Sequence, residues 1–274
     1  MSKHKDKNIL MAGPWCGEFG WEIIKWQPVV RYWATKMGFD KVYVGIQKGH
    51  EILYQDYEPN FIYFEQLPDA DGWGDRHHNS PNFKEKLIAK IQREGHVTIL
   101  QPKLEHMKAP KDKKIHKMFG KKTKGLKYDI LVNARWTNKC GHHWRDWPLA
   151  RWGELMDYFK NKYKMASIGI PSQSKWIHHT DNLLGKPLSE LVNIMASSRL
   201  IIGPSSGPMH LASVCGCHQL IWTDNKNWGG AGGNNRHRYE VSWNPFRTPV
   251  TVLDDCNWKP QVSNVIREID KILS

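Results

Sequence analysis

Short apolar runs alternate with amphipathic stretches along the first hundred residues. The runs are rich in β-branched and aromatic side chains, which is typical of strands. The expected strands are residues 8–13, 41–46, 61–67 and 97–102. Residues 21–38 and 83–94 have apolar positions at helical spacing, and Pro28 should kink or interrupt the first of these helices. This alternation predicts an α/β unit with a parallel sheet.

The second half of the chain repeats the pattern more regularly. Its expected strands are residues 128–134, 165–170, 199–204 and 218–223, and its expected helices are residues 148–163, 188–198, 208–216 and 260–273. We therefore predict two α/β domains meeting across a cleft. Residues 1–102 form the first domain, 103–127 a lysine-rich linker, and 128–274 the second domain.

Composition excludes several classes of protein. The 274 residues are 40% hydrophobic, which is enough for packed cores and excludes a disordered or fibrous chain. No apolar run approaches the ~18 residues of a membrane span, so we expect no transmembrane segment. The basic start of the chain is interpreted as a frayed tail instead of a signal peptide. Five sparsely spaced cysteines favour a reducing compartment, so we expect a cytoplasmic protein, with a peripheral position at the inner membrane face as an option.

The formal net charge of +13 is concentrated in one segment. Residues 103–127 contain ten lysines against only Glu105 and Asp112, which places +8 of the +13 there. Such a segment can bind phosphates of nucleic acid or of an anionic lipid surface. The alternative is a solvated linker, and both interpretations stay open.

Residues 199–216 contain the strongest chemical motif. A buried strand ends in a small-residue loop, and a helix begins near Pro208. The amides of Ser206, Gly207 and Met209 should point out of the helix N-terminus, where the dipole favours anions, and His210 could donate to a phosphate or ribose oxygen. The alternative is a plain strand-to-helix turn with Ser206 as N-cap.

Two motifs here resemble those of glycosyltransferase family 9, the bacterial heptosyltransferase-like enzymes. One is GPSSGPMHLAS with the helix and strand before it, and the other is RDWPLARWGELMDYF at 145–159. The resemblance implies a GT-B-like fold of two Rossmann-like domains facing across a cleft. It also implies that the second domain holds a nucleoside-diphosphate-sugar donor without a metal or other cofactor.

The resemblance assigns diphosphate binding to one basic residue and one loop. The residues are Arg145, Ser205, Ser206, Gly207, Pro208, Met209 and His210. The family usually has Asp where this chain has Ser205, and that carboxylate is expected to touch the sugar. Heptose therefore does not follow as the donor sugar.

The glycine- and tryptophan-rich stretch at 13–28 is the candidate site of the first domain. An inverting transfer needs a base that removes the proton of the acceptor hydroxyl. Glu22 lies six residues before Pro28, which is the spacing of the family's proposed Asp base, and Glu18 is the nearby alternative. Flanking tryptophans should raise the pKa of such a carboxyl group. An acidic residue favoured only by the helix dipole is the simpler interpretation of either one.

Two other features remain without an assigned role. Cys140, His142 and His143 suggest zinc, but no partner pair at ligand spacing follows, and we predict no metal site.

The glycine-rich stretch at 228–238, with Arg236 and Arg238, is either a loop that closes over the nucleotide or an ordinary surface loop.

The sequence thus favours an inverting glycosyltransferase with a nucleotide-sugar donor and an anionic hydroxyl acceptor. The expected acceptor is a surface glycan or lipopolysaccharide-type molecule that carries phosphate. One alternative is a phage-type DNA glycosyltransferase acting on hydroxymethylated bases, in which the lysines contact the DNA backbone. Another is a catalytically idle nucleotide- or nucleic-acid-binding protein that keeps the fold.

Overall fold

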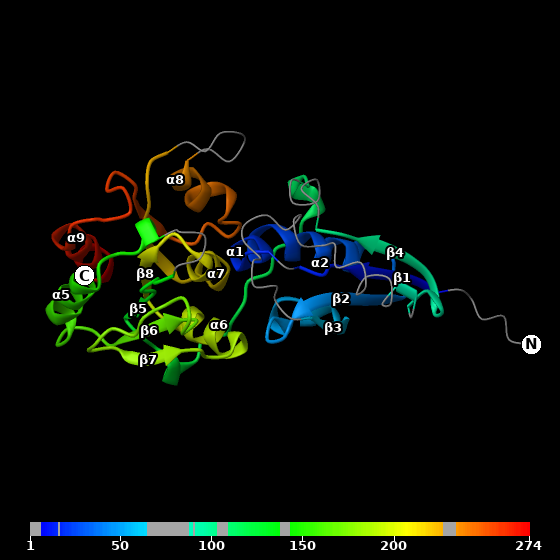
Figure 1. Ribbon diagram of the computed structural model, residues 1–274, viewed down its shortest axis with the longest axis horizontal. Helices are drawn as coiled ribbons and strands as arrows, with labels where there is room; N and C mark the ends of the chain where they lie inside the picture. Colours follow the sequence, from blue (N-terminus) through cyan, green and yellow to red (C-terminus); the bar gives the residue numbers. More distant parts are fainter. Residues whose placement is uncertain are drawn as a thin grey trace, which may run out of the picture. The chain divides into compact units, whose positions relative to one another are not determined.

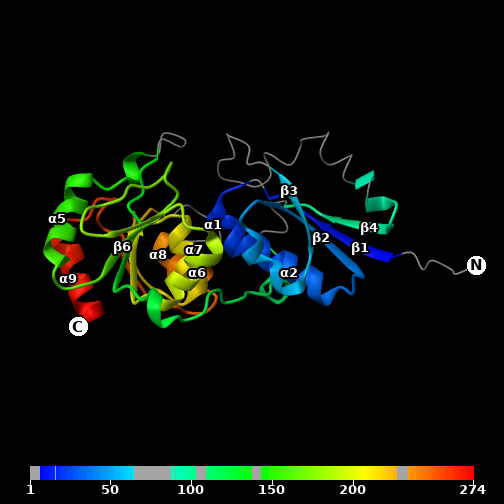
Figure 2. The same ribbon diagram turned by 90° about the horizontal axis from the view of Figure 1, so that it is seen from below.

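The computed structural model describes residues 7–15, 17–64, 88–89, 91–102, 109–137, 143–226 and 234–274. The chain divides into two compact units, Met1–Lys117 and Met118–Ser274. Each unit contains a parallel β-sheet with helices packed on it (Figures 1 and 2). Across the described ranges no helix combines the length and the apolar character that a membrane crossing requires.

The first unit has a four-stranded sheet in the order β3-β2-β1-β4, and all neighbouring strands are parallel. The strands are β1 (Lys7–Ala12), β2 (Lys41–Gln47), β3 (Asn60–Phe64) and β4 (Gly95–Leu100). Three of them confirm the predicted strands closely. The predicted strand at 61–67 is observed to Phe64, and its remaining residues lie outside the described ones. Of the predicted helix at 83–94, residues 88, 89, 91 and 92 are helical, and 83–87 and 90 lie outside the described residues.

The helical segment after β1 changes type along its length. It consists of α1 (Phe19–Trp21), the π-helical turn η1 (Glu22–Trp26) and α2 (Gln27–Lys36), with Pro28 in the first turn of α2. Because proline has no N–H and cannot continue an α-helical ladder from the preceding turn, the expected interruption appears as this wide turn. The Gln27 amide accordingly donates to the Glu22 carbonyl five residues earlier.

The second unit has a six-stranded parallel sheet in the order β10-β9-β8-β5-β6-β7. Its strands are β5 (Ile130–Val132), β6 (Met165–Gly169), β7 (Asp181–Leu184), β8 (Leu200–Pro204), β9 (His218–Trp222) and β10 (Val250–Leu253). The sequence did not predict β7 and β10. Both are short edge strands, and β7 begins with the exposed polar pair Asp181 and Asn182, so neither has the buried apolar run that marks a central strand.

Helices cover both faces of this sheet. The longer helices are α5 (Leu149–Phe159), α6 (Leu188–Ser197), α7 (Gly207–Cys215) and α9 (Val262–Leu273). The helices α5 and α9 share one core with alternate residues of the central strands, and α6 and α7 lie side by side (Figures 1 and 2). Three buried indoles, Trp147, Trp152 and Trp222, meet in that core with ring centroids about 5 Å apart.

Each sheet has one point where the strand order reverses. In the first unit this point is between β1 and β4, and in the second it is between β5 and β8. Ligands of open α/β sheets bind beyond the carboxyl ends of the strands at such points. The loop after β1 and the loop after β8, which contain the two predicted sites, both start there.

The lysine-rich segment is attached to both units. Its residues 103–108 lie outside the described ones. In the first unit the Ile115 amide donates to the Pro28 carbonyl at 2.9 Å. In the second, the Phe119 amide donates to the Val214 carbonyl at 2.7 Å and the Lys121 amide to the Asn193 side chain at 2.8 Å. The boundary between the units, after residue 117, thus lies within the segment for which the sequence predicts a linker.

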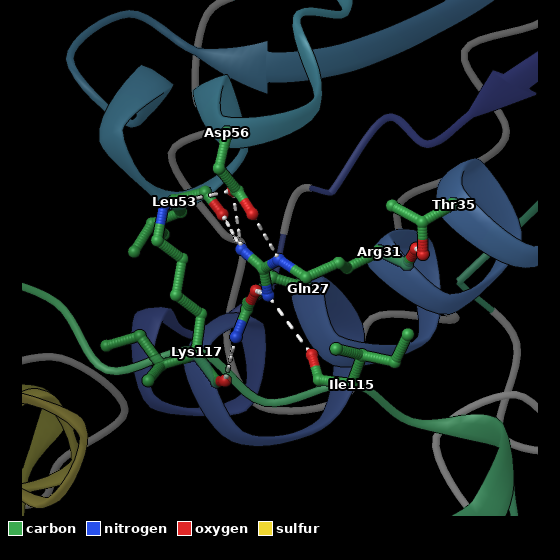
Figure 3. A network of polar contacts seen from close by, with 8 residues as sticks. Gln27, Arg31, Thr35, Leu53, Asp56, Ile115 and Lys117 are labelled. Atoms are coloured by element: carbon green, nitrogen blue, oxygen red, sulfur yellow. Dashed lines mark hydrogen bonds and ion pairs between the residues drawn. The ribbon is translucent and has the colours of Figure 1, made fainter.

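Arg31 of α2 organises the attachment to the first unit (Figure 3). Its guanidinium donates to both carboxylate oxygens of Asp56, to the Leu53 carbonyl at 2.7 Å and to the Ile115 carbonyl at 3.2 Å. Burial raises the pKa of Asp56, but hydrogen bonding and charge from Arg31 outweigh it, so the net pKa is lowered. A buried arginine therefore joins α2, the turns after β2 and the lysine-rich segment.

Candidate active site

Ser205 directly follows β8 and is buried, with 6% of its surface exposed. Its hydroxyl lies 2.7 Å from the hydroxyl of Tyr239, and its amide donates to the Trp222 carbonyl. Tyr239 comes from η9 (Arg238–Ser242), a π-helical turn that follows the short helix α8 (Asn235–His237). The position at which the resemblance implies a carboxylate therefore has a small neutral hydroxyl that is already hydrogen-bonded.

Ser206 is the N-cap residue of α7, but its side chain does not cap the helix. Its hydroxyl donates to the Pro204 carbonyl and lies 2.6 Å from the amide nitrogen of Asn133, a buried residue at the carboxyl end of β5. Asn133 thus ties the two strands together at the point where the strand order reverses.

The first turn of α7 leaves one backbone donor available. The amides of Met209 and His210 both donate to the Ser206 carbonyl, at 3.1 and 3.3 Å, so the outward-pointing Met209 amide that the sequence suggested is used inside the turn. Pro208 has no N–H. Within the described part of the chain, the Gly207 amide has no hydrogen-bond partner. An anion at this end would meet that amide and the positive end of the helix dipole.

His210 lies on the aromatic wall of the same loop. Its ring stacks on Tyr239 with centroids 5.0 Å apart and an interplanar angle of 5°, and Trp243 packs edge-on at 4.8 Å. The ring is partly exposed, and its Nε2 lies 3.4 Å from the Tyr239 hydroxyl. This packing fixes the orientation of the imidazole before any ligand binds.

Two arginines flank the loop. Arg145 lies with its guanidinium 5.6 Å from the ring of Trp144 and 5.4 Å from that of Trp258, while Arg238 lies 5.0 Å from the ring of Trp243. Burial raises the pKa of Tyr239, and the positive charges of Arg145 and Arg238 both act in the opposite direction, which places both cations near its hydroxyl. The structure therefore brings Arg145 to the loop Ser205–His210 and adds Arg238.

Arg236, two residues before Arg238, is engaged elsewhere. It pairs with both carboxylate oxygens of Asp254, at 2.9 and 2.6 Å, and with Glu240 at 3.3 Å. The two arginines of the glycine-rich stretch thus differ, because Arg236 makes structural ion pairs and Arg238 borders the loop. Residues 227–233 of that stretch lie outside the described ones.

Asp224 lies beyond the carboxyl end of β9 and is buried, with 3% of its surface exposed. Its Oδ1 accepts a long hydrogen bond from Asn235 at 3.5 Å, and its Oδ2 has no hydrogen-bond partner among the described residues. A buried carboxylate oxygen without a partner is costly and favours a ligand that donates hydroxyls. Sequence analysis gave Asp224, Asn133 and Tyr239 no role, although Asn133 and Asp224 closely follow apolar strands.

Glu22 of the first unit is fully buried, with 1% of its surface exposed. The Tyr54 hydroxyl donates to its Oε1 at 2.8 Å, and Nδ1 of His50 lies 2.8 Å from its Oε2. Burial and the charge of Glu22 raise the pKa of Tyr54 well above its usual value. Burial lowers the pKa of His50, but the Glu22 carboxylate outweighs it and the net pKa is raised.

Glu18 lies in a different environment. Its side chain is exposed, and its carbonyl accepts the amides of Trp21 and Glu22 at the start of α1. The expected tryptophan surroundings are present, since Trp15 and Trp26 are both buried and stack with centroids 6.1 Å apart. The two candidate carboxylates therefore divide into a buried one held by two donors and an exposed one.

Possible metal ligands gather at the surface of the second unit. Asp157 of α5 lies with its carboxylate 3.1 Å from Nε2 of His179 and 3.5 Å from Nε2 of His178, and all three are exposed. Lys160 lies 3.2 Å from the same carboxylate and, with His178, lowers the pKa of Asp157. We interpret this group as a surface ion-pair cluster. Of the earlier zinc motif, Cys140 and His142 lie outside the described residues.

Comparison with known proteins gives structural matches only. No family model matches the chain, and no curated protein matches it. A glycosyl transferase family 9 structure from Veillonella parvula superposes with a TM-score of 0.63 at 14% identity, covering 97% of each chain. The ADP-heptose lipopolysaccharide heptosyltransferase II of E. coli superposes with a TM-score of 0.61 at 13% identity, covering 97% of this chain and 98% of that one. The E. coli heptosyltransferase WaaC with ADP superposes with a TM-score of 0.58 at 10% identity, covering 97% of this chain and 99% of that one.

These matches extend over nearly the whole chain, and their identities are low. They confirm the predicted α/β architecture, in which the two parallel sheets are observed to have four and six strands. The structural neighbours are family 9 heptosyltransferases, and this chain has the GT-B fold that they share.

Proposed function

We propose that this protein is an inverting glycosyltransferase that moves a sugar from a nucleoside-diphosphate donor to a hydroxyl acceptor. The observation that carries the proposal is the loop Ser205–His210. It combines a helix N-terminus, a backbone amide that has no partner among the described residues, and two flanking arginines, at the point where the strand order of the larger sheet reverses.

This geometry supports the proposal that the loop binds a diphosphate. The Gly207 amide, the helix dipole, Arg145 and His210 would hold the leaving diphosphate, with Arg238 as an added cation. These groups can neutralise the charge that develops as the bond to the sugar breaks, so we propose that transfer requires no metal ion. Two E. coli WaaC structures similar to this chain contain ADP and ADP-2-deoxy-2-fluoro heptose, which supports a nucleotide-sugar donor.

The identity of the donor sugar does not follow from the family pattern. Ser205 supplies no carboxylate, and its hydroxyl is occupied by Tyr239. Asp224 is the buried carboxylate at the same edge of the sheet, and its Oδ2 would accept a hydrogen bond from a donor hydroxyl. We therefore propose that the donor sugar is a hexose or a heptose.

The proposed acceptor is a phosphorylated surface glycan of the lipopolysaccharide type. The described part of the lysine-rich segment includes six exposed lysines. The exposed lysines of its described part are Lys111, Lys113, Lys121, Lys122, Lys124 and Lys127. Exposed ammonium groups attract acceptor phosphates.

Calorimetric titration with ADP, UDP, GDP and dTDP tests the donor site. Wild-type protein should bind at least one of them, and Arg145→Gln should weaken that binding about 10- to 100-fold, the loss of one charge-assisted contact. The matched control is Arg199→Gln, because Arg199 pairs with Asp129 at the surface and should not affect affinity. Equal binding by both variants would contradict the assignment, and transfer that EDTA abolishes would contradict metal independence.

A further inference from the structure

The carboxylate of Glu22 has little capacity to act as the base by itself. Both of its oxygens are hydrogen-bonded, to Tyr54 and to His50, and only 1% of its surface is exposed. A general base must come within hydrogen-bond distance of the proton that it removes. Because Glu22 is buried, an acceptor hydroxyl could reach its carboxylate only if the surrounding side chains moved.

His50 is the exposed member of this group. Its side chain is 20% exposed, and Nδ1 is directed at the Glu22 carboxylate. Since an ionised carboxylate only accepts hydrogen bonds, Nδ1 carries the proton and Nε2 carries the lone pair. Among the described residues Nε2 has no hydrogen-bond partner, so it is the ring nitrogen that can accept a proton from a bound hydroxyl.

The fold holds the histidine and the carboxylate together from different elements. Glu22 opens the π-helical turn after β1, and His50 follows β2, the neighbouring parallel strand. Tyr54 fixes the second oxygen of the carboxylate, and the ring of Phe19 packs against His50 with centroids 5.2 Å apart. The imidazole is thereby oriented at the carboxyl edge of the smaller sheet.

We propose that His50 is the catalytic base of the transfer and that Glu22 is its positioning residue, an inference that rests on the proposed function. Nε2 takes the proton from the acceptor hydroxyl while the acceptor oxygen forms a bond to the anomeric carbon. The bond from that carbon to the diphosphate oxygen breaks, and its electron pair leaves with the diphosphate. The imidazolium that forms is stabilised by its hydrogen bond to the Glu22 carboxylate.

The charged surroundings of His50 predict how the rate depends on pH. Glu22 on η1 and Glu51 on the adjacent turn both raise the pKa of His50, against burial, which lowers it. Because only neutral His50 accepts a proton, turnover should rise with pH through an apparent pKa above 6.5. Of the two carboxylates, Glu22 raises the pKa of His50 more. The residual activity of Glu22→Gln should therefore rise at a lower pH than the activity of the wild-type protein.

The test measures release of nucleoside diphosphate from ADP-glucose, ADP-heptose, UDP-glucose, GDP-mannose and dTDP-glucose, with water as the acceptor. The informative variant is His50→Asn, because the asparagine amide can keep the hydrogen bond to Glu22 while the basic nitrogen is lost. We expect turnover to fall 100-fold or more with unchanged affinity for the nucleoside diphosphate. His96→Asn, the same substitution at an exposed histidine of β4, is the matched control and should stay within about twofold of wild type.

The possible outcomes separate the two proposals. Wild-type turnover that His50→Asn retains would overturn the role of His50 and leave the transferase proposal intact. A pH profile of Glu22→Gln that does not move would overturn the positioning role of Glu22. A folded wild-type protein that releases no nucleoside diphosphate from any donor would refute the proposed function itself, and the base assignment with it.

Discussion

Ser205 and Tyr239 show how a single side chain can redefine a binding loop. The hydroxyl of Ser205 is buried at the end of β8 and lies 2.7 Å from the hydroxyl of Tyr239, which is buried as well. Tyr239 in turn stacks on His210. The tyrosine therefore supports two residues of the proposed diphosphate loop without belonging to it.

Tyr239→Phe should destabilise the protein modestly and weaken nucleotide binding. The substitution leaves the buried Ser205 hydroxyl without its partner, which costs about 1–2 kcal/mol of unfolding free energy. We expect affinity for the bound nucleoside diphosphate to fall a few fold, because the His210 ring loses part of its support. Chemical denaturation and calorimetry measure the two effects. Tyr158→Phe, at an exposed tyrosine, is the control, and equal effects in both variants would contradict the supporting role.

His116 makes a separate, pH-dependent contribution to stability. Burial, together with the charges of Lys114, Arg31 and Lys25, lowers its pKa from 6.5 to about 4. Because the folded pKa lies below the unfolded value, the unfolded chain binds more protons between these values, and stability falls as pH decreases from about 6.5 to 4. The loss is at most roughly 3 kcal/mol, reduced by the partial exposure of the ring.

Denaturation at several pH values tests this prediction. In His116→Gln, which cannot be protonated, the unfolding free energy should depend less on pH across that window. An unchanged slope would show that His116 titrates normally.

The sequence identified only part of each site, and the reason is separation along the chain. Ser206, Gly207 and His210 lie within five residues of one another, in a strand-to-helix motif whose pattern is visible without a structure. His50 and Tyr239 reach their partners Glu22 and Ser205 from 28 and 34 residues away. Only the register of the parallel strands and the π-helical turns brings them together, and neither leaves a local pattern.

At the scale of elements, the central strands and the long helices could be predicted because their apolar spacing is regular. The edge strands β7 and β10 could not, since they are short and only half-buried. The structure of the lysine-rich segment could also not be predicted fully from the sequence. Its charge suggests a solvated chain, but its few apolar and glycine residues, such as Phe119 and Gly120, pack against the second unit.

Gly120 is required for this attachment. Its φ is +79°, and a Cβ would lie 2.1 Å from the Val192 carbonyl oxygen. Gly120→Ala should therefore lower the unfolding free energy by about 2 kcal/mol or more, because it adds a clash to a strained backbone. Gly125 in the same segment is the matched control, since a Cβ there meets nothing within 4 Å. Equal stability of the two alanine variants would show that the segment is not tightly attached.

At the scale of the whole molecule, the net charge of +13 no longer describes a uniformly basic protein. Most of the excess lies in residues 103–127, and the rest of the chain is close to balanced. The described lysines of that segment are divided between the two units: the first has Lys111, Lys113, Lys114 and Lys117, and the second has Lys121, Lys122, Lys124 and Lys127. This distribution favours local contact with acceptor phosphates.

Binding to random duplex DNA across a salt series distinguishes a glycan acceptor from DNA. If the lysines contact only a few acceptor phosphates, the protein should bind duplex DNA weakly. The slope of log affinity against log salt concentration should then be no steeper than about −3. Fluorescence anisotropy between 50 and 200 mM salt measures it. Tight binding with a slope of about −6 or steeper would favour a DNA acceptor and argue against the surface glycan.

The central claim is the transfer of a sugar from a nucleoside-diphosphate donor with inversion. Proton NMR of a panel of nucleotide sugars, incubated with the protein and water or a hydroxyl acceptor, follows both donor loss and the anomeric configuration of the first product. The account predicts release of nucleoside diphosphate from at least one donor, with the opposite anomeric configuration in the product. An intact panel in the presence of folded protein, or a product of retained configuration, would contradict it.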